Sequence, residues 1–247
     1  MTFSKPYATR KALEQTIAHH TWLNEHAEPL RLPPIVTVHP DRIDFASIEG
    51  RHAISADAPV VATALGRAHA SAWKSDLHRA LLTAAHPLIG GHELPDFVSP
   101  RIAALRRHRH AGLVSARQVT AVQSLLATNP AMPVAFYKDT NPRNVLITTA
   151  GPVMVDFDDL TLAPFGYDLA KLLVTLAMTY GRLPFETFTK PLACYNRPLI
   201  EAGLPTVSID QFLDHAELHH LLTLPYLGRG GYRHTWPTVR PHLEDLK

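Results

Sequence analysis

The stretch that decides the fold is FYKDTNPRNVLITTAGPVMVDFDD, residues 136–159. Residues 145–147 and 153–155 are short β-branched runs, and Ala150-Gly151-Pro152 between them supplies turn residues. Two such runs joined by a glycine-containing turn predict a β-hairpin. The hairpin matters because polar side chains stand at both of its ends.

Three of these polar side chains are Asp139, Asn144 and Asp156. The first two precede the hairpin in the spacing D-x-x-x-x-N, and Asp156 ends its second strand, so we expect them to converge at one edge. Mg²⁺ binds a few hard oxygen ligands and fills its shell with water and phosphate oxygens, and Asn144 and Asp156 form such a partial set. Asp139 beside them could accept the proton of an attacking hydroxyl, as phosphoryl transfer requires. The competing interpretation is that all three are only turn residues.

The composition excludes several classes of protein. The chain has 247 residues, 46% of them apolar, and a formal net charge of +2. This length can bury a core as one domain or two lobes, and the balanced charge argues against nucleic acid as a partner. The single cysteine, Cys194, cannot form an internal disulfide and fits a reducing compartment. The N-terminus lacks the apolar region of a signal peptide, and the longest apolar run contains Lys171. We therefore expect a cytoplasmic protein without membrane contact.

The periodicity of the remaining chain predicts an α+β fold. We expect a strand over residues 1–6, a helix over residues 9–27 capped by Thr9, and a hairpin over residues 34–50. A helix-start signal follows at Asp57 and Pro59, and beyond it nearly everything except the 145–155 hairpin is expected to be helical. The helix that begins at Tyr167 is expected to stop at Gly181.

The spacing D-x-x-x-x-N, followed by a strand that ends in D-F-D, resembles the aminoglycoside/choline phosphotransferase family. In that family the loop commonly reads H-G-D-x-x-x-x-N and the metal aspartate stands in I-D-[FW], where this chain has YKDTNPRN and VDFD. In GYDLAKLLV, Asp168 matches the aspartate that braces the catalytic loop. LGRAHA (residues 65–70) and IEG (residues 48–50) resemble the helix after the interlobe linker and the linker itself.

This resemblance implies a protein-kinase-like fold of two lobes. Residues 1–50 would form a truncated N-terminal lobe of strand, helix and hairpin. Residues 51–247 would form a mainly helical C-terminal lobe that carries the catalytic loop and the metal site.

The implied activity is Mg²⁺-dependent transfer of the γ-phosphoryl group of ATP or GTP to a hydroxyl of a small molecule. Antibiotics, sugars, amino alcohols and nucleosides all remain open as acceptors. The implied roles are the catalytic base Asp139, the metal ligands Asn144 and Asp156, the donor-phosphate lysine Lys5 paired with Glu14, and the purine-binding backbone of Ser47 and Ile48. A homodimer is compatible with this activity.

Two departures from the family pattern affect these expectations. Tyr137 replaces the usual histidine of the loop, and Lys138 replaces the glycine, where it could help stabilise developing phosphate charge. Only four residues precede Lys5, and no G-x-G-x-x-G occurs, so we expect the glycine-rich loop to be absent and donor binding to be weak and dependent on Mg²⁺. Because this loop is expected to be absent, an alternative interpretation remains: a catalytically silent pseudokinase that binds nucleotide or a partner protein.

Other polar segments have more ordinary interpretations. Asp158 and Asp159 are expected to be loop or supporting carboxylates. His215 and His219 could bind zinc from one helix face, but no third ligand is suggested among the 16 histidines. The basic run at residues 106–112 fits a solvated helix end, and GRGGYRHTW (residues 228–236) fits a loop that could border the acceptor pocket.

Overall fold

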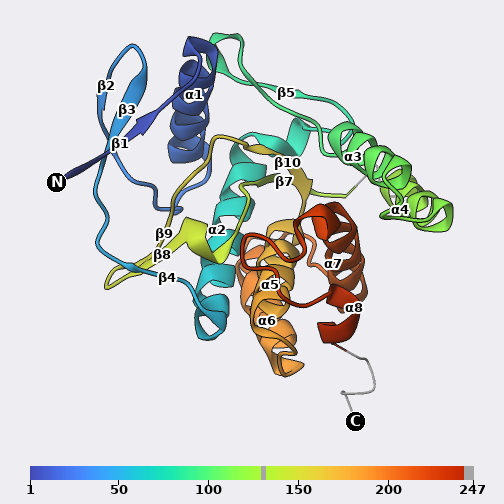
Figure 1. Ribbon diagram of the computed structural model, residues 1–247. Helices are drawn as coiled ribbons and strands as arrows, with labels where there is room; N and C mark the ends of the chain where they lie inside the picture. The colour runs from blue at the N-terminus through green and yellow to red at the C-terminus, as the bar shows by residue number, and fades with distance from the viewer. Residues whose placement is uncertain (129–131, 242–247) are drawn as a thin grey trace.

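The computed structural model describes residues 1–128 and 132–241 (Figure 1). Residues 129–131 and 242–247, which belong to the expected C-terminal lobe, lie outside the described part. The helices are α1 (Arg10–His26), α2 (Ala58–Ser75), α3 (Val98–His110), α4 (Ala116–Thr128), α5 (Tyr167–Tyr180), α6 (Glu186–Glu201), α7 (Ile209–Thr223) and α8 (Trp236–Val239). The strands are β1 (Thr2–Pro6), β2 (Ile35–Val38), β3 (Arg42–Ala46), β4 (Arg51–His52), β5 (His86–Pro87), β6 (Glu93–Leu94), β7 (Val134–Tyr137), β8 (Val145–Thr148), β9 (Gly151–Met154) and β10 (Thr161–Pro164).

The first part of the chain forms a small antiparallel sheet of order β1-β3-β2 beside α1 (Figure 1). Lys5 on β1 lies opposite Ile43 on β3. The hydroxyl of Thr9 accepts a hydrogen bond from the amide of Ala12 at 3.2 Å and caps α1, which confirms the predicted helix start. Because residues 47–50 run without regular structure between this sheet and β4, we propose the lobe boundary there.

The helical part is built around α2, which packs closely along α6 (Figure 1). Gly66 makes this approach possible, since a Cβ at this position would collide with the carbonyl oxygen of Tyr195. α5 is buried along most of its length and ends at Gly181, as predicted. The mixed helix and strand architecture is the expected kinase-like one. No helix in the described ranges is both long enough and apolar enough to cross a membrane.

The predicted hairpin is present, because β8 and β9 pair antiparallel with Val145 opposite Met154. The second part is mainly helical, as expected, but it contains short strands outside this hairpin that were not predicted. β4 extends this hairpin by pairing with β8, β5 pairs with β6, and β7 pairs with β10. These strands span only two to four residues, which is too short to establish an alternating pattern.

A buried carboxylate joins α1 to the segment after α2. Asp76 accepts hydrogen bonds from Trp22 Nε1 at 2.8 Å and Arg79 at 2.7 Å, and lies 2.8 Å from His86 Nε2. Burial works to raise the pKa of Asp76, but the bonds from Trp22, His86 and Arg79 outweigh it and lower the pKa to about 2. Ionised Asp76 is therefore more stable in the folded protein than in the unfolded chain.

Acid should remove this contribution. The folded pKa of Asp76 lies below the unfolded value, so its stabilisation is complete above about pH 5 and is lost as the pH falls toward 2. We expect the Asp76→Asn variant to be about 2–3 kcal/mol less stable than the wild type at pH 6 and nearly equal to it near pH 2. Denaturant unfolding at both pH values measures this difference, and exposed Asp41→Asn is the control. A stability difference independent of pH would contradict the assignment.

Candidate active site

The predicted catalytic loop lies between β7 and β8. Asp139 follows β7, and Asn144 ends a 3-10 turn over Pro142–Asn144. Asn144 Nδ2 donates to the carbonyl oxygen of Asp139 at 3.0 Å. The amide of Val155, the neighbour of Asp156, donates to the carbonyl oxygen of Asn144 at 2.9 Å. The two ends of the hairpin are thus tied together beside the loop.

Asp139 and Asp156 share an unusual backbone conformation. Their φ angles are 50° and 64°, and they are the two non-glycine residues with positive φ in the described part of the chain. This left-handed region costs energy for residues with a side chain and persists where the surrounding structure holds it. Such positions concentrate at functional sites. The backbone therefore singles out the two carboxylates that the sequence assigned to proton transfer and metal binding.

The Asp139 carboxylate has two partners on one of its oxygens. Tyr137 donates its hydroxyl to Oδ1 at 3.0 Å, and Lys171 Nζ lies 3.0 Å from the same atom. Burial works to raise the pKa of Asp139, but the charge and hydrogen bond of Lys171 outweigh it and lower the pKa. Lys171 was not predicted as a site residue, although it was visible as the single charge within the apolar run of α5.

Lys138 differs from its predicted role. Its side chain is 1% exposed, and its ammonium donates to the carbonyl oxygen of Val155. Burial lowers the pKa of Lys138 to about 8. The lysine supports the chain that carries Asp156.

The predicted brace of the loop is present in Asp168. Its carboxylate accepts a hydrogen bond from the amide of Lys138 at 3.3 Å, and His69 Nε2 lies 3.6 Å away. His69 also lies 2.7 Å from the hydroxyl of Tyr195, so the motif LGRAHA places a buried histidine behind the catalytic loop.

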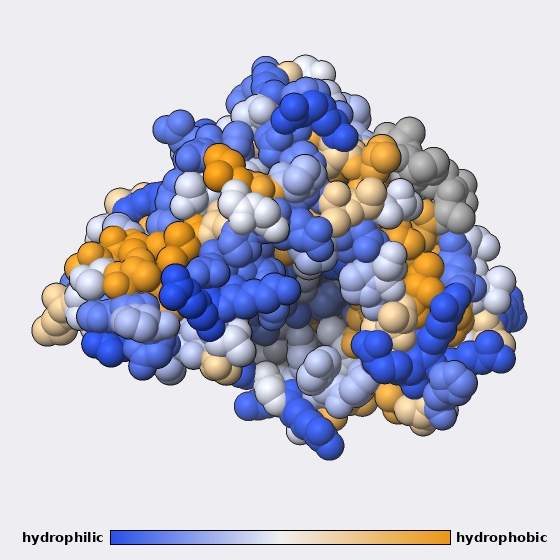
Figure 2. Space-filling view, turned by 90° about the horizontal axis from the view of Figure 1, so that it is seen from above, coloured by the Kyte–Doolittle hydropathy of each residue, from blue (hydrophilic) through white to orange (hydrophobic). Residues whose placement is uncertain are grey.

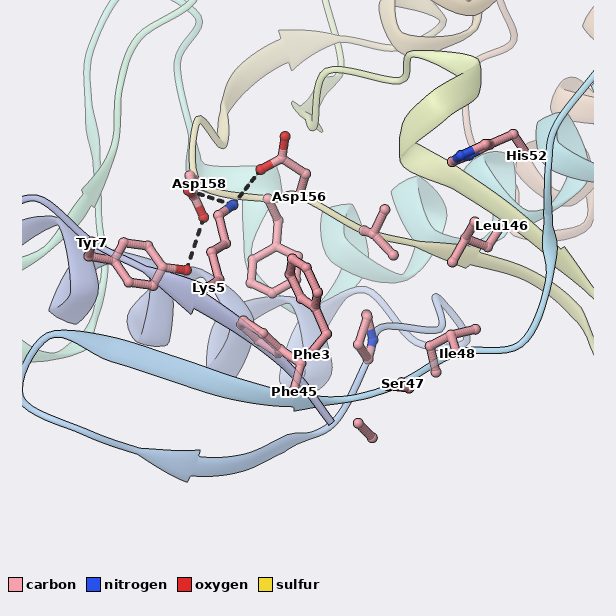
Figure 3. A pocket seen from close by; sticks show the side chains of 14 residues that line it. Phe3, Lys5, Tyr7, Phe45, Ser47, Ile48, His52, Leu146, Asp156 and Asp158 are labelled. Carbon is pink, nitrogen blue, oxygen red and sulfur yellow. Dashed lines mark hydrogen bonds and ion pairs between the residues drawn. The ribbon is translucent and has the colours of Figure 1, made fainter. Parts of the chain in front are cut away.

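The predicted pairing of Lys5 with Glu14 is not formed. Lys5 Nζ lies 2.6 Å from Asp156 Oδ1 and 2.7 Å from Asp158 Oδ2 (Figure 3). Glu14 instead pairs with Arg10 at 2.7 Å and is 46% exposed. The contact between Lys5 and α1 runs through Asp158, which accepts a hydrogen bond from Thr16 at 3.1 Å. Asp158, which was expected to be only a loop or supporting carboxylate, thus occupies the place expected for Glu14.

Neutralising Asp158 and neutralising Glu14 should have different effects on the kinetics. Asp158→Asn removes a charged partner that holds Lys5, so we expect kcat/KM for the nucleotide to fall by roughly tenfold, the effect of one charge-assisted hydrogen bond. Glu14→Gln should leave kcat/KM nearly unchanged, because Glu14 touches neither Lys5 nor the cavity described below. Steady-state kinetics on the two variants makes the comparison. A larger loss for Glu14→Gln would restore the original prediction.

The oxygens around Asp156 suit a hard cation. Asn144 donates through Nδ2, and Asp156 meets Lys5 through Oδ1, so Asn144 Oδ1 and Asp156 Oδ2 are without a hydrogen bond among the described residues. Burial and the charges of Asp158, Asp156 and Asp139 raise the pKa of Asp159, which shows a local excess of negative charge. Mg²⁺ takes one or two such ligands and completes its shell with water and phosphates.

A zinc site at His215 and His219 is not supported. Within residues 1–128 and 132–241, no three His, Cys, Asp or Glu side chains gather as a zinc site would need. His215 and His219 are buried against Tyr167, with ring centroids 6.0 and 5.9 Å from its ring. They belong to the packing of α7 on α5.

A cavity of about 770 Å³ lies beside Lys5 and Asp156 (Figure 3). Its walls are mainly apolar. The apolar side chains come from the first sheet, from β8 and from the segment that follows β9: Phe3, Phe45, Leu146, Val155 and Phe157. Ser47 and Ile48 line the end of the cavity that lies away from Lys5 (Figure 3). The amide of Ser47 donates to the carbonyl oxygen of Met1 at 3.1 Å, whereas the carbonyl of Ser47 and the amide of Ile48 have no backbone hydrogen bond among the described residues. Around a hollow near its middle, the surface seen from above is mostly hydrophilic (Figure 2).

The family model described as the phosphotransferase enzyme family matches residues 4–193. This chain belongs to that family. The match spans β1 to α6 and includes Lys5, the catalytic loop and Asp156. No curated protein matches the chain significantly.

Solved structures share the fold at low sequence identity. Macrolide 2'-phosphotransferase type I is 14% identical, with 98% of this chain and 84% of that chain covered and a TM-score of 0.62. The Plasmodium vivax ethanolamine kinase is 14% identical, with 92% and 69% covered and a TM-score of 0.61. An aminoglycoside-3'-phosphotransferase of type VIII is 19% identical, with 90% and 84% covered and a TM-score of 0.56.

Proposed function

We propose that this phosphotransferase is a small-molecule kinase that moves the γ-phosphoryl group of ATP or GTP to a hydroxyl of its acceptor, with Mg²⁺ as cofactor. The observation that carries the proposal is the arrangement of three groups. Asp139 offers a carboxylate oxygen to the solvent side, and Asn144 and Asp156 offer free oxygens on the neighbouring hairpin. The proposed base and metal ligands would therefore stand side by side, as transfer to a hydroxyl requires.

The apolar cavity is the proposed site of the donor. A purine ring would lie between Phe45 and Leu146, which line the cavity, with its polar edge toward the backbone groups of Ser47 and Ile48. Lys5, at the other end of the cavity, would then meet the phosphates. Two structural neighbours support nucleotide binding, one in complex with ADP and streptomycin and one with AMP-PNP and Ca²⁺.

Asn144 and Asp156 would hold Mg²⁺, which neutralises charge on the phosphate oxygens when it is bound. The transfer step then rests on Asp139. The acceptor oxygen forms a bond to the γ-phosphorus as the bridging bond to the β-phosphate breaks and the nucleoside diphosphate leaves. The hydroxyl proton goes to the Asp139 carboxylate and afterwards to solvent.

The acceptor would approach Asp139 from the side opposite to the donor. The glycine-rich segment 228–236 borders this side, because the Tyr232 hydroxyl accepts a hydrogen bond from Lys171 at 3.3 Å. Arg143 of the catalytic loop donates to the carbonyl oxygen of Gly230 in the same segment. These contacts support the prediction that the segment borders the acceptor pocket, and the acceptor class remains open among hydroxylated small molecules.

Calorimetric titration of ATP and GTP with and without Mg²⁺, followed by a transfer screen over hydroxylated antibiotics, sugars, amino alcohols and nucleosides, tests the proposal. We expect Mg²⁺-dependent binding of one nucleotide and transfer to at least one acceptor. Binding without transfer to any acceptor would favour the alternative, a nucleotide-binding pseudokinase. No binding of either nucleotide would contradict the kinase activity and would favour a pseudokinase that binds a partner protein.

A further inference from the structure

The inference starts from a buried charge on α5. Lys171 is 5% exposed and stands between Ala170 and Leu172, in a helix whose other buried residues are mainly apolar. Burying an ammonium group is costly unless it is paired and hydrogen-bonded. The charged partner of the Lys171 ammonium is the Asp139 carboxylate. Burial works to lower the pKa of Lys171, but the charge of Asp139 and the hydrogen bonds with Asp139 and Tyr232 outweigh it and raise the pKa. The lysine is therefore held in its charged form at the proposed base.

The geometry divides the two oxygens of Asp139 between different tasks. Oδ1 receives both the Lys171 ammonium and the Tyr137 hydroxyl, each at 3.0 Å. Oδ2 has one neighbour among the described residues, Asn144 Nδ2 at 3.5 Å, which is too long for a strong hydrogen bond. One oxygen is thus anchored to the protein, and the other is left for an acceptor hydroxyl. The side chain of Asp139 is 45% exposed, so this second oxygen is reachable.

Lys171 also connects the base to the C-terminal segment. Its ammonium donates to the hydroxyl of Tyr232 at 3.3 Å, and Thr175, one helical turn further along α5, lies 3.3 Å from the same hydroxyl. Tyr232 belongs to the segment that borders the proposed acceptor side. A single buried lysine therefore fixes the base, the helix beneath it and the acceptor-side segment relative to one another.

We propose that Lys171 is a positioning residue for phosphoryl transfer. The inference rests on the proposed function, since it acts through Asp139 as the base. Lys171 holds Oδ1, leaves Oδ2 open for the acceptor, and keeps the carboxylate from rotating when the acceptor binds. In this arrangement Lys171 has no contact with the donor cavity, so its contribution falls on the transfer step and not on nucleotide binding.

Three variants separate this role from a merely structural one. Lys171→Met keeps the length of the stem and removes the charge, Lys171→Arg keeps the charge, and Lys190→Met changes an exposed lysine of α6 as the control. We expect Lys171→Met to lower kcat by roughly 10–100-fold, the usual effect of misplacing a reacting group, with the nucleotide Kd changed by less than about twofold. Lys171→Arg should recover part of kcat, and Lys190→Met should match the wild type.

The double variant tests whether Lys171 acts through Asp139. With Asp139→Asn already present, Lys171→Met should lower kcat no further, because the group that it positions is gone. Thermal unfolding adds a readout independent of turnover. Asp139→Asn should lower the Tm by leaving the ammonium unpaired, and adding Lys171→Met should recover part of that loss.

Several results would overturn the inference. Wild-type kcat in folded Lys171→Met, an equal further loss in the Asp139→Asn background, or a loss confined to nucleotide Kd would each contradict it while leaving the kinase activity standing. Additive changes in Tm would contradict the ion pair itself. A wild-type protein that transfers no phosphate to any acceptor would contradict the proposed function, and the inference with it.

Discussion

Asp139→Asn should lower turnover by roughly 10²–10⁴-fold while leaving the affinity for Mg²⁺–nucleotide nearly unchanged, as expected for loss of a general base. The reason is geometric. Asp139 lies outside the donor cavity, and its open oxygen faces solvent beside the metal ligands. An asparagine keeps the shape of the side chain, but it cannot accept the hydroxyl proton.

The measurement pairs kcat with a calorimetric Kd for the nucleotide, with Asp41→Asn as a control for loss of one exposed carboxylate. Because the variant leaves Lys171 without its ionic partner, the folded fraction should be checked by circular dichroism at the assay temperature. Equal losses in nucleotide affinity and in turnover would point instead to a role for Asp139 in holding the metal.

Asp156→Ala should abolish the Mg²⁺-dependent part of nucleotide binding. Asp156 is the anionic member of the proposed metal pair, and its loss should weaken Mg²⁺ binding by more than about 100-fold, the upper range for residues that only support a metal ligand. Nucleotide binding without Mg²⁺ should persist. Lys5 loses one of its two carboxylate partners but keeps Asp158, so its ammonium becomes freer to meet phosphate.

Calorimetric titrations with and without Mg²⁺ on the wild type and on Asp156→Ala separate the two effects. Asp41→Ala, which removes an exposed carboxylate far along the sequence from the loop, is the matched control. Mg²⁺-enhanced nucleotide binding that survives in Asp156→Ala would contradict the metal assignment, and loss of all binding would assign Asp156 to the donor itself.

Local sequence signals were enough to predict the hairpin and the helix ends that surround the candidate site. The β-branched runs and the turn at residues 150–152 predicted the hairpin, and β8 and β9 confirm it. Thr9 marked the start of α1 and Gly181 the end of α5, because capping and stopping depend on one or two residues. These features need no knowledge of distant contacts.

The partner of Lys5 depended on which face of α1 turns inward. The buried positions include Leu13, Thr16 and Leu23, whereas Glu14 lies about 100° around the helix from Leu13 and is exposed. The helical period therefore already placed Thr16 on the inner side. The ion pair of Lys5 with Asp158 joins residues 5 and 158, and no local pattern specifies such a contact.

The sequence also predicted the wrong lysine, Lys138 instead of Lys171, beside Asp139, and the cause is again a contact between distant parts of the chain. Lys138 was predicted next to a phosphoryl group because it precedes Asp139 in the chain, but its side chain is buried and its ammonium donates to the carbonyl oxygen of Val155. Lys171 reaches Asp139 from α5, and its partner becomes visible only once that helix is packed under the loop. The charge in an apolar helix was the available signal, since a buried lysine requires a partner.

The most direct test of the account is ³¹P NMR of a single reaction mixture that contains the protein, Mg²⁺, the nucleoside triphosphate and an acceptor from the screen. We predict that a phosphomonoester resonance of the acceptor grows together with nucleoside diphosphate in equal amounts. We also predict that Asp139→Asn suppresses both signals. Formation of diphosphate with inorganic phosphate alone, or a phosphomonoester formed equally fast by Asp139→Asn, would contradict the proposal that Asp139 activates an acceptor hydroxyl.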